Sequence, residues 1–320
     1  MTASTQSLPH VPSRPSNGKH SLRGTSRKRT LHDQIISTFN SIRFALLEPV
    51  LLRLARASRA SEYAAKEKEP LISVVIPTFN RAQILLERGV PTVLSQTHQN
   101  LELIIIGNTC TDDTAERLSR IHDPRLTFYN LPPRKLRHPD DPETRWLVGG
   151  LEPTNEGIRR ARGQWVAWLG DDDLWTPNHL EKLLLAAQGG DFEFVSAQYE
   201  EERFGEKKIV DGERANSGYH TRRPSPANDD SPRIGGIQTW LFRSYLRFFK
   251  LNIHCWRKSW NRPVDADVYL RMYNAGVRMG YLDEIVAFVL PRPGEETIGL
   301  DAYLIAGRES PTLPKVVPGC

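Results

Sequence analysis

Three consecutive aspartates, Asp171, Asp172 and Asp173, follow the largely apolar stretch WVAWLG at residues 165–170. Carboxylates this close together repel one another, and each loses hydration near a core, so a cation is expected beside them. Mg²⁺ and Mn²⁺ take oxygen ligands and often complete their coordination with substrate phosphates. One aspartate could instead cap the helix that starts near Pro177, but three are more than capping requires.

The segments before the aspartates predict the sheet that would position them. Short apolar runs indicate buried strands at residues 71–77, 101–107, 125–131 and 164–170. Helical segments lie between them at 81–96, which Gly89 and Pro91 interrupt, at 111–121 with Thr111 as its N-cap, and at 154–161.

This alternation predicts an α/β fold with a mostly parallel sheet and helices on both faces. Ligands of such sheets bind beyond the carboxyl ends of the strands. Asn80, Asn108 and the three aspartates all follow strands, so we expect them to line one crevice.

The rest of the chain continues this pattern. A helix is expected at 177–187, a strand at 191–199, a helix at 265–276 that ends on glycine, and two short strands within 277–290. Residues 200–234 are polar and predict a mobile loop or lid. The Gly- and Pro-rich tail from Pro291 is expected to be loosely held, which gives a domain over 70–290 and a tail over 291–320.

The N-terminal part divides into two segments. Residues 1–30 are basic and poor in large apolar residues, so we expect disorder there. Residues 31–69 form a leader whose part up to Lys66 has the pattern of a basic amphipathic helix, split in two by Pro49. The leader could pack on its own domain or on a partner chain, or it could lie on an anionic membrane.

Charge and composition indicate which partners and which cellular compartment to expect. The first 70 residues hold 12 Lys/Arg against 5 Asp/Glu, so the leader carries the excess positive charge while the rest of the chain is net negative. Residues 1–30, which hold six of these Lys/Arg, contain no aromatic residue, which argues against nucleic-acid binding. Three scattered cysteines predict a reducing, cytoplasmic location. No apolar run approaches the length of a membrane span, and peripheral contact at the inner face of the membrane is left open.

Four segments in this order resemble family 2 glycosyltransferases: SVVIPTFNRAQ (73–83), NLELIIIGNTCTDDTAERL (100–118), NEGIRRARGQWVAWLGDDDLWTPNHLEKL (155–183) and DADVYLRMYNAGVRMGYLDEIVAFV (265–289). The resemblance covers about residues 70–290. It implies a Rossmann-like GT-A fold, a nucleotide-sugar donor and a divalent metal at a D-x-D motif. It also implies inversion at the anomeric carbon through a catalytic carboxylate.

The resemblance assigns roles to individual residues. Asp172 and Asp173 match the metal-binding motif, and Asp171 would lie toward the ribose. Asp265 stands where the family places its catalytic base, although Val264 replaces the usual glutamate. Asp267 would be a first-turn acid paired with Arg271. The residues that would border the nucleotide are Pro77, Thr78, Asn80, Arg81 and Asn108.

Asn108 stands where relatives have an aspartate that contacts the base. An asparagine carbonyl can accept the N3–H of uracil or thymine, so a UDP- or dTDP-sugar is the expected donor. The expected acceptor is a glycan, a lipid-linked glycan or a polysaccharide. Two alternatives stay open: a sugar nucleotidyltransferase, which would want a Gly- and Lys-rich loop after the first strand, and a nucleotide-sugar-binding subunit without turnover.

Overall fold

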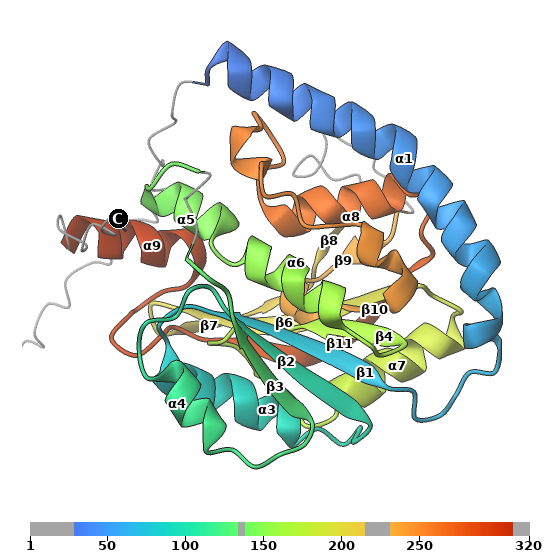
Figure 1. Ribbon diagram of the computed structural model, residues 1–320, viewed down its shortest axis with the longest axis horizontal. Helices are drawn as coiled ribbons and strands as arrows, with labels where there is room; N and C mark the ends of the chain where they lie inside the picture. The colour runs from blue at the N-terminus through green and yellow to red at the C-terminus, as the bar shows by residue number, and fades with distance from the viewer. Residues whose placement is uncertain (1–28, 134–137, 215–230, 310–320) are drawn as a thin grey trace, which may run out of the picture.

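A nine-stranded sheet runs through the centre of the computed structural model, which describes residues 29–133, 138–214 and 231–309 (Figure 1). The strand order is β3-β2-β1-β4-β10-β6-β11-β5, and β7 pairs with β6. The parallel half contains β1 (Ile72–Thr78), β2 (Leu101–Gly107), β3 (Leu126–Asn130) and β4 (Trp165–Trp168). The other half contains β5 (Leu174–Trp175), β6 (Phe194–Arg203), β7 (Glu206–Val210), β10 (Leu241–Arg243) and β11 (Met279–Val289).

Helices cover both faces of this sheet, as predicted. The helices of the domain are α2 (Ala82–Ile84), α3 (Val90–Leu94), α4 (Thr114–Ser119), α5 (Pro142–Val148), α6 (Leu151–Arg160), α7 (His179–Gly189), α8 (Val264–Ala275) and α9 (Gly299–Glu309). Helix α6 packs on β1 and β2, whereas α3 and α4 lie on the opposite face (Figure 1). The approach of α6 is so close that a Cβ at Gly157 would meet the Val75 side chain at 2.3 Å.

Several predicted elements have different bounds from those observed. The helix expected from Thr111 begins at Thr114, because the Asp112 carboxylate accepts hydrogen bonds from the backbone and hydroxyl of that residue. The stretch after β1 is helical through Pro91, with a π-helical turn at Leu85–Gly89. The two strands expected in 277–290 are one strand, β11, whose pairing with β6 is irregular between Leu282 and Ala287.

The expected lid at 200–234 is partly sheet. Strand β6 continues to Arg203 and forms a hairpin with β7, and β8 (Glu213–Arg214) pairs with β9 (Arg233–Ile234). Residues 215–230 of this segment, like the basic tail at 1–28, lie outside the described residues.

The prediction of a loosely held tail from Pro291 is wrong for the described residues 291–309. They include α9, which packs against α5. The local Gly and Pro content indicated a loose segment, but the contacts that hold it come from residues far away in the sequence.

The leader is one continuous helix, α1 (Leu31–Ala64), and Pro49 does not split it. Figure 1 shows α1 extending along one side of the domain and bending around it. It is tied to the domain by charged groups along its length. Asp33 pairs with Arg257, Glu48 pairs with Arg271, and Arg56 donates two hydrogen bonds to Glu193 at 2.7 and 2.5 Å.

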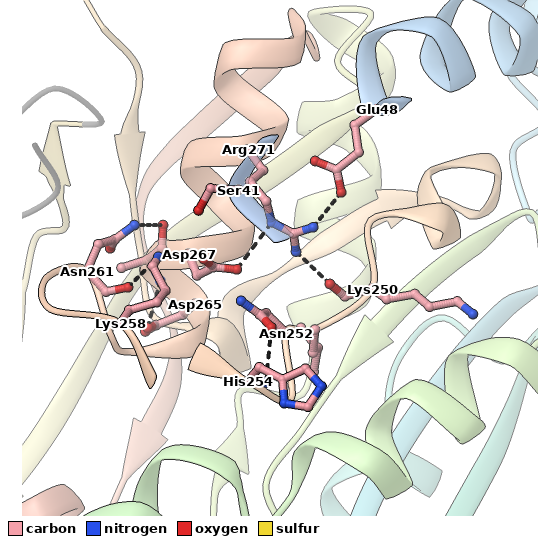
Figure 2. Close-up of polar contacts among 12 residues, drawn as sticks. Ser41, Glu48, Lys250, Asn252, His254, Lys258, Asn261, Asp265, Asp267 and Arg271 are labelled. Atoms are coloured by element: carbon pink, nitrogen blue, oxygen red, sulfur yellow. Dashed lines mark hydrogen bonds and ion pairs between the residues drawn. The ribbon is translucent and has the colours of Figure 1, made fainter. Parts of the chain in front are cut away.

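The contact between α1 and α8 is a buried ionic cluster (Figure 2). Arg271 of α8 pairs with Glu48 of α1 and, at 3.2 Å, with Asp267 one turn earlier. Lys258 donates to the other oxygen of Asp267 at 2.6 Å. Burial raises the pKa of Glu48 to about 7, although Arg271 opposes that rise. The cluster therefore balances two buried acids with two cations.

Removing Arg271 should destabilise the protein, because it would leave the buried Glu48 without its ion pair and Asp267 with Lys258 as its remaining partner. We expect Arg271→Ala to lower the free energy of unfolding in urea by about 3 kcal/mol or more. The control is Arg159→Ala, which removes an exposed cation from its pair with Glu156 on α6. That control should unfold at the wild-type urea concentration. Equal unfolding midpoints for both variants would show that the cluster does not hold α1 on the domain.

Candidate active site

The carboxyl ends of β1, β2 and β4 meet at one edge of the sheet, as the sequence predicted. Thr78 lies opposite Gly107 across the β1–β2 pair, and the backbone N–H of Asn108 donates to the Thr78 carbonyl at 2.8 Å. The hydroxyl of Thr78 donates to Asp171 Oδ2 at 2.8 Å. Arg81 donates to Asp171 Oδ1 at 3.0 Å. The structure thus brings residues from three separate loops into direct contact.

Asp171 anchors these loops to one another. It is buried, with 4% of its surface exposed, and both of its oxygens already accept hydrogen bonds from Thr78 and Arg81. Burial raises its pKa and Arg81 opposes that shift. The predicted contact of Asp171 with a ribose stays a prediction.

The carboxylates of Asp172 and Asp173 converge over Gly170. A Cβ at Gly170 would lie 2.7 Å from Asp173 Oδ2 and 3.0 Å from Asp172 Oδ1, so both oxygens face one small volume. Burial raises the pKa of Asp173 well above its usual value, and the neighbouring Asp172 and Asp171 raise it further. Among the described residues Asp173 has no ion pair, so this volume favours an added positive charge.

Three arginines supply part of the positive charge that the aspartate run requires. Arg81 and Arg292 approach Asp172 Oδ2 at 3.5 and 3.8 Å. Arg88 donates to the Asp172 carbonyl at 3.1 Å and to the Pro291 carbonyl at 3.0 Å. The chain itself therefore supplies part of the positive charge that the three aspartates require. Asp173 has no ion pair among the described residues.

Arg88, Arg292 and Tyr303 are site residues that the sequence analysis missed. Arg88 ties the backbone after β11 to the aspartate loop. Arg81 donates to the Tyr303 hydroxyl at 3.4 Å. Tyr303 lies on α9, in the segment that was expected to be a loose tail. In the sequence these residues show only a charge or an aromatic ring at positions far from the aspartates. Their place in the site follows from the fold.

The carboxylates of Asp172 and Asp173 fit a divalent metal whose remaining coordination positions are filled by a substrate. In the described ranges no group of three or more His, Cys, Asp or Glu side chains could hold a metal. Two carboxylate oxygens that face one volume are enough for Mg²⁺ or Mn²⁺ when phosphate oxygens and water fill the other positions. Asp172 and Asp173 are the residues that would hold it.

Asn80 and Asn108 shape the loops that border this edge. Asn80 has a left-handed backbone conformation with φ of 51°, which asparagine tolerates better than most residues. Its Oδ1 accepts from the backbone N–H of Thr111 at 2.8 Å, which ties the β1 loop to the β2 loop. Asn108 donates from its amide to the Gly149 carbonyl at 3.1 Å, so its other polar atom is an acceptor. Pro77 lies under the α5–α6 junction, near Gly150.

Asp265 and Asp267 have different surroundings, although both lie in the first turn of α8. Asp267 is buried in the ionic cluster with Lys258 and Arg271. Asp265 is half-buried and accepts from the backbone N–H of Ala266 at 2.8 Å. Burial raises the pKa of Tyr199 on β6, and the carboxylates of Glu201, Asp265 and Asp173 raise it further. Tyr199 therefore lies within electrostatic reach of both Asp265 and the aspartate run.

A family model described as Glycosyl transferase family 2 matches residues 73–249, more than half of the chain. The chain belongs to this family, which confirms the predicted class of protein. A putative colanic acid biosynthesis glycosyl transferase of Escherichia coli K12, WcaA, is 32% identical over 38% of this chain and 39% of its own length. A putative teichuronic acid biosynthesis glycosyltransferase of Bacillus subtilis, TuaG, is 32% identical over 36% of this chain and 41% of its own.

A more distant relative is WfgD of Escherichia coli, named as a UDP-Glc:alpha-D-GlcNAc-diphosphoundecaprenol beta-1,3-glucosyltransferase. It is 24% identical over 41% of this chain and 46% of its own length. The matched stretch thus spans less than half of each of these relatives. The solved structure of residues 1–349 of S. aureus TarS in complex with UDP-GlcNAc superposes with a TM-score of 0.51 and 15% identity over 70% of this chain and 60% of that one. This likeness confirms the GT-A fold.

The space over Gly170 should be essential for the metal. Gly170→Ala would place a methyl group between the Asp172 and Asp173 oxygens. We therefore expect it to abolish Mn²⁺-dependent turnover while the far-ultraviolet circular dichroism stays unchanged. The control is Gly189→Ala at the end of α7, where a Cβ meets nothing within 4 Å. Wild-type Mn²⁺ dependence in Gly170→Ala would show that no metal occupies this volume.

Proposed function

We propose that this protein is an inverting glycosyltransferase that moves a sugar from a nucleoside diphosphate to an acceptor hydroxyl. The observation that carries the proposal is the pair of converging carboxylates over Gly170, with Arg81 and Arg292 beside them, at the edge of the sheet where such folds bind ligands. Membership of Glycosyl transferase family 2 supports it.

The donor would lie across the loops after β1, β2 and β4. Pro77, Thr78, Asn80 and Arg81 would border the nucleotide, and the Asn108 carbonyl would accept the N3–H of uracil or thymine. A UDP- or dTDP-sugar is accordingly the proposed donor. TarS was solved with UDP-GlcNAc, and WfgD is named for UDP-Glc, which agrees with a uracil base.

Positive charge beside the diphosphate is the main catalytic requirement, because the leaving diphosphate gains negative charge as its bond to the anomeric carbon breaks. Mg²⁺ or Mn²⁺ held by Asp172 and Asp173 would act as a Lewis acid on the phosphate oxygens. Arg292 and Arg81 add fixed positive charge beside the same carboxylate oxygen of Asp172. Asp171 would serve mainly to hold Thr78 and Arg81 in place, with any ribose contact secondary.

Asp265 is the proposed general base. The N-terminal end of α8 favours its ionised form, and a carboxylate there can take the proton of the attacking hydroxyl. A single displacement with the base opposite the leaving group inverts the anomeric carbon. The neighbouring Asp267 is unsuited to this role, because Lys258 and Arg271 already hold it inside the ionic cluster.

The proposed acceptor is a hydroxyl of a glycan, a lipid-linked glycan or a growing polysaccharide. WcaA and TuaG are named for the biosynthesis of colanic acid and of teichuronic acid, both polysaccharides, which supports this class. The reaction would take place in the cytoplasm. The free thiols of Cys110 and Cys255 agree with a reducing compartment.

A donor-binding subunit without turnover is a second candidate. In its favour, Val264 stands where the family resemblance places a glutamate beside the base. Release of nucleotide from a panel of UDP- and dTDP-sugars, measured with Mn²⁺ and a mixture of acceptor glycans, separates the two. Turnover supports the enzyme, whereas donor binding without any release of nucleotide supports the subunit.

The double variant Asp172→Asn with Asp173→Asn should lose Mn²⁺-dependent nucleotide release, because both proposed metal ligands lose their charge. Its fold should survive, since the substitution removes repulsion among three acids. Asp283→Asn, which changes an exposed acid on β11, is the control and should keep full activity. Activity that persists in the double variant, or in the wild type with excess chelator, would remove the metal from the mechanism.

Asp265→Asn should slow turnover by roughly 10²–10⁴, the usual contribution of general-base catalysis, with donor affinity nearly unchanged. Asp267→Asn should cost much less in rate and more in stability, because it breaks the cluster with Lys258 and Arg271. Rates and urea unfolding of both variants test this ranking. The reverse ranking would make Asp267 the base, and two active variants would place the base outside α8.

A further inference from the structure

The outer face of α1 exposes an unusual number of large apolar side chains. In the part of the chain that the structure describes, nine of the fifteen exposed large apolar residues belong to this one helix. They form the outer face of α1: Leu31, Ile35, Phe39, Ile42, Leu46, Leu47, Val50, Leu51 and Leu54. Large apolar side chains gathered on one exposed face indicate a binding surface.

The polarity of α1 is the reverse of that of an ordinary surface helix. Its inner face buries the acids Asp33 and Glu48, which pair with Arg257 and Arg271 of the domain. An ordinary helix turns its apolar stripe toward the core and its charges toward water. In α1 the ion pairs, together with the buried Leu52 and Tyr63, attach the helix to the domain, and most of its large apolar side chains face outward.

The exposed charges of α1 have one sign. Between Leu31 and Ser61 the only acids in the sequence are the two that are buried, whereas Arg43, Arg53 and Arg59 are exposed. The 30 residues that precede α1 add six Lys/Arg and no acid. The remainder of the chain after residue 70 is net negative, so the excess positive charge belongs to the part of the sequence that contains α1 and the residues before it.

We propose that the outer face of α1 inserts into the interface of an anionic lipid bilayer, with the helix lying in the membrane plane. Apolar side chains at the level of the headgroups, together with basic residues attracted to anionic lipids, are what such binding requires. The proposal is independent of the proposed glycosyl transfer, because it depends only on the exposed side chains of α1.

The charged contacts of α1 favour the plane of the membrane over a path across it. By length and composition α1 could span a bilayer, which the sequence analysis did not anticipate. Spanning would, however, detach Asp33, Glu48 and Arg56 from their partners and place all three in hydrocarbon, where charges are costly. An in-plane helix keeps every one of these pairs.

The attachment of α1 also orients the rest of the molecule. Glu48 binds Arg271 on α8, and the first turn of α8 carries Asp265. A bilayer that holds α1 would therefore hold α8 at a fixed position relative to the membrane surface. Such an arrangement suits an acceptor that is itself anchored in lipid.

The direct test is co-sedimentation of the full-length protein with vesicles of phosphatidylcholine containing phosphatidylglycerol. We expect Phe39→Ser combined with Leu46→Ser to lower the partition coefficient at least about tenfold, because two large apolar side chains lose their burial in lipid. Leu185→Ser, which removes an equally exposed leucine from α7, is the control and should bind like the wild type. Nucleotide release in solution should be the same for all three proteins.

Charge provides an independent arm of the same experiment. Arg43→Glu combined with Arg53→Glu should weaken binding to the anionic vesicles, and raising the salt concentration should weaken binding of the wild type. Unchanged partition of both double variants would overturn the proposal. A second outcome would also overturn it: the wild type does not bind vesicles, light scattering shows that it is a dimer, and the double serine variant is a monomer. A second copy of the chain would then cover the outer face of α1. Wild-type protein that resists alkaline carbonate extraction would overturn the in-plane placement.

Discussion

The crowding of three carboxylates at the end of β4 is the constraint on which the candidate site depends. The charge of Asp171 is balanced by Arg81, and Thr78 donates a hydrogen bond to its other oxygen. These two contacts fix the β1 loop against the β4 loop. Asp172 is flanked by arginines, whereas Asp173 has no ion pair among the described residues. The folded chain thus carries an incompletely balanced negative charge at one point, where a cation and a diphosphate together would restore the balance.

The same principle holds the leader on the domain. Buried acids of α1 and α8 share Arg271, so a helix that the sequence places far from the site becomes part of the support for α8 (Figure 2). Buried ion pairs add little to stability compared with apolar packing, but losing one partner is costly. This chain uses them to fix the orientation of a helix that packs Leu52 and Tyr63 on the domain but turns most of its large apolar side chains outward.

Much of the sheet could be predicted from local sequence, because buried parallel strands are continuous apolar runs: the predicted strand at 101–107 coincides with β2. The glycine end of α8 was also predictable, since Gly276 takes the left-handed conformation there. The sequence could not identify three residues of the site, Arg88, Arg292 and Tyr303. Their distance from the aspartates depends on where the fold places the segment after β11 and helix α9. The prediction of a break at Pro49 was wrong as well, because α1 continues through the proline, beside the buried Glu48 that pairs with the domain.

The central claim is that Asp172, Asp173 and the nearby arginines form a single site for a metal bound to a diphosphate. Titration of Mn²⁺ followed by electron paramagnetic resonance, with and without UDP, tests it most directly. The account predicts weak binding of Mn²⁺ alone and at least about tenfold tighter binding with UDP, with an equal effect of Mn²⁺ on the affinity for UDP, because coupling is reciprocal. Binding of UDP that is indifferent to Mn²⁺, together with no uptake of Mn²⁺ in its presence, would contradict it.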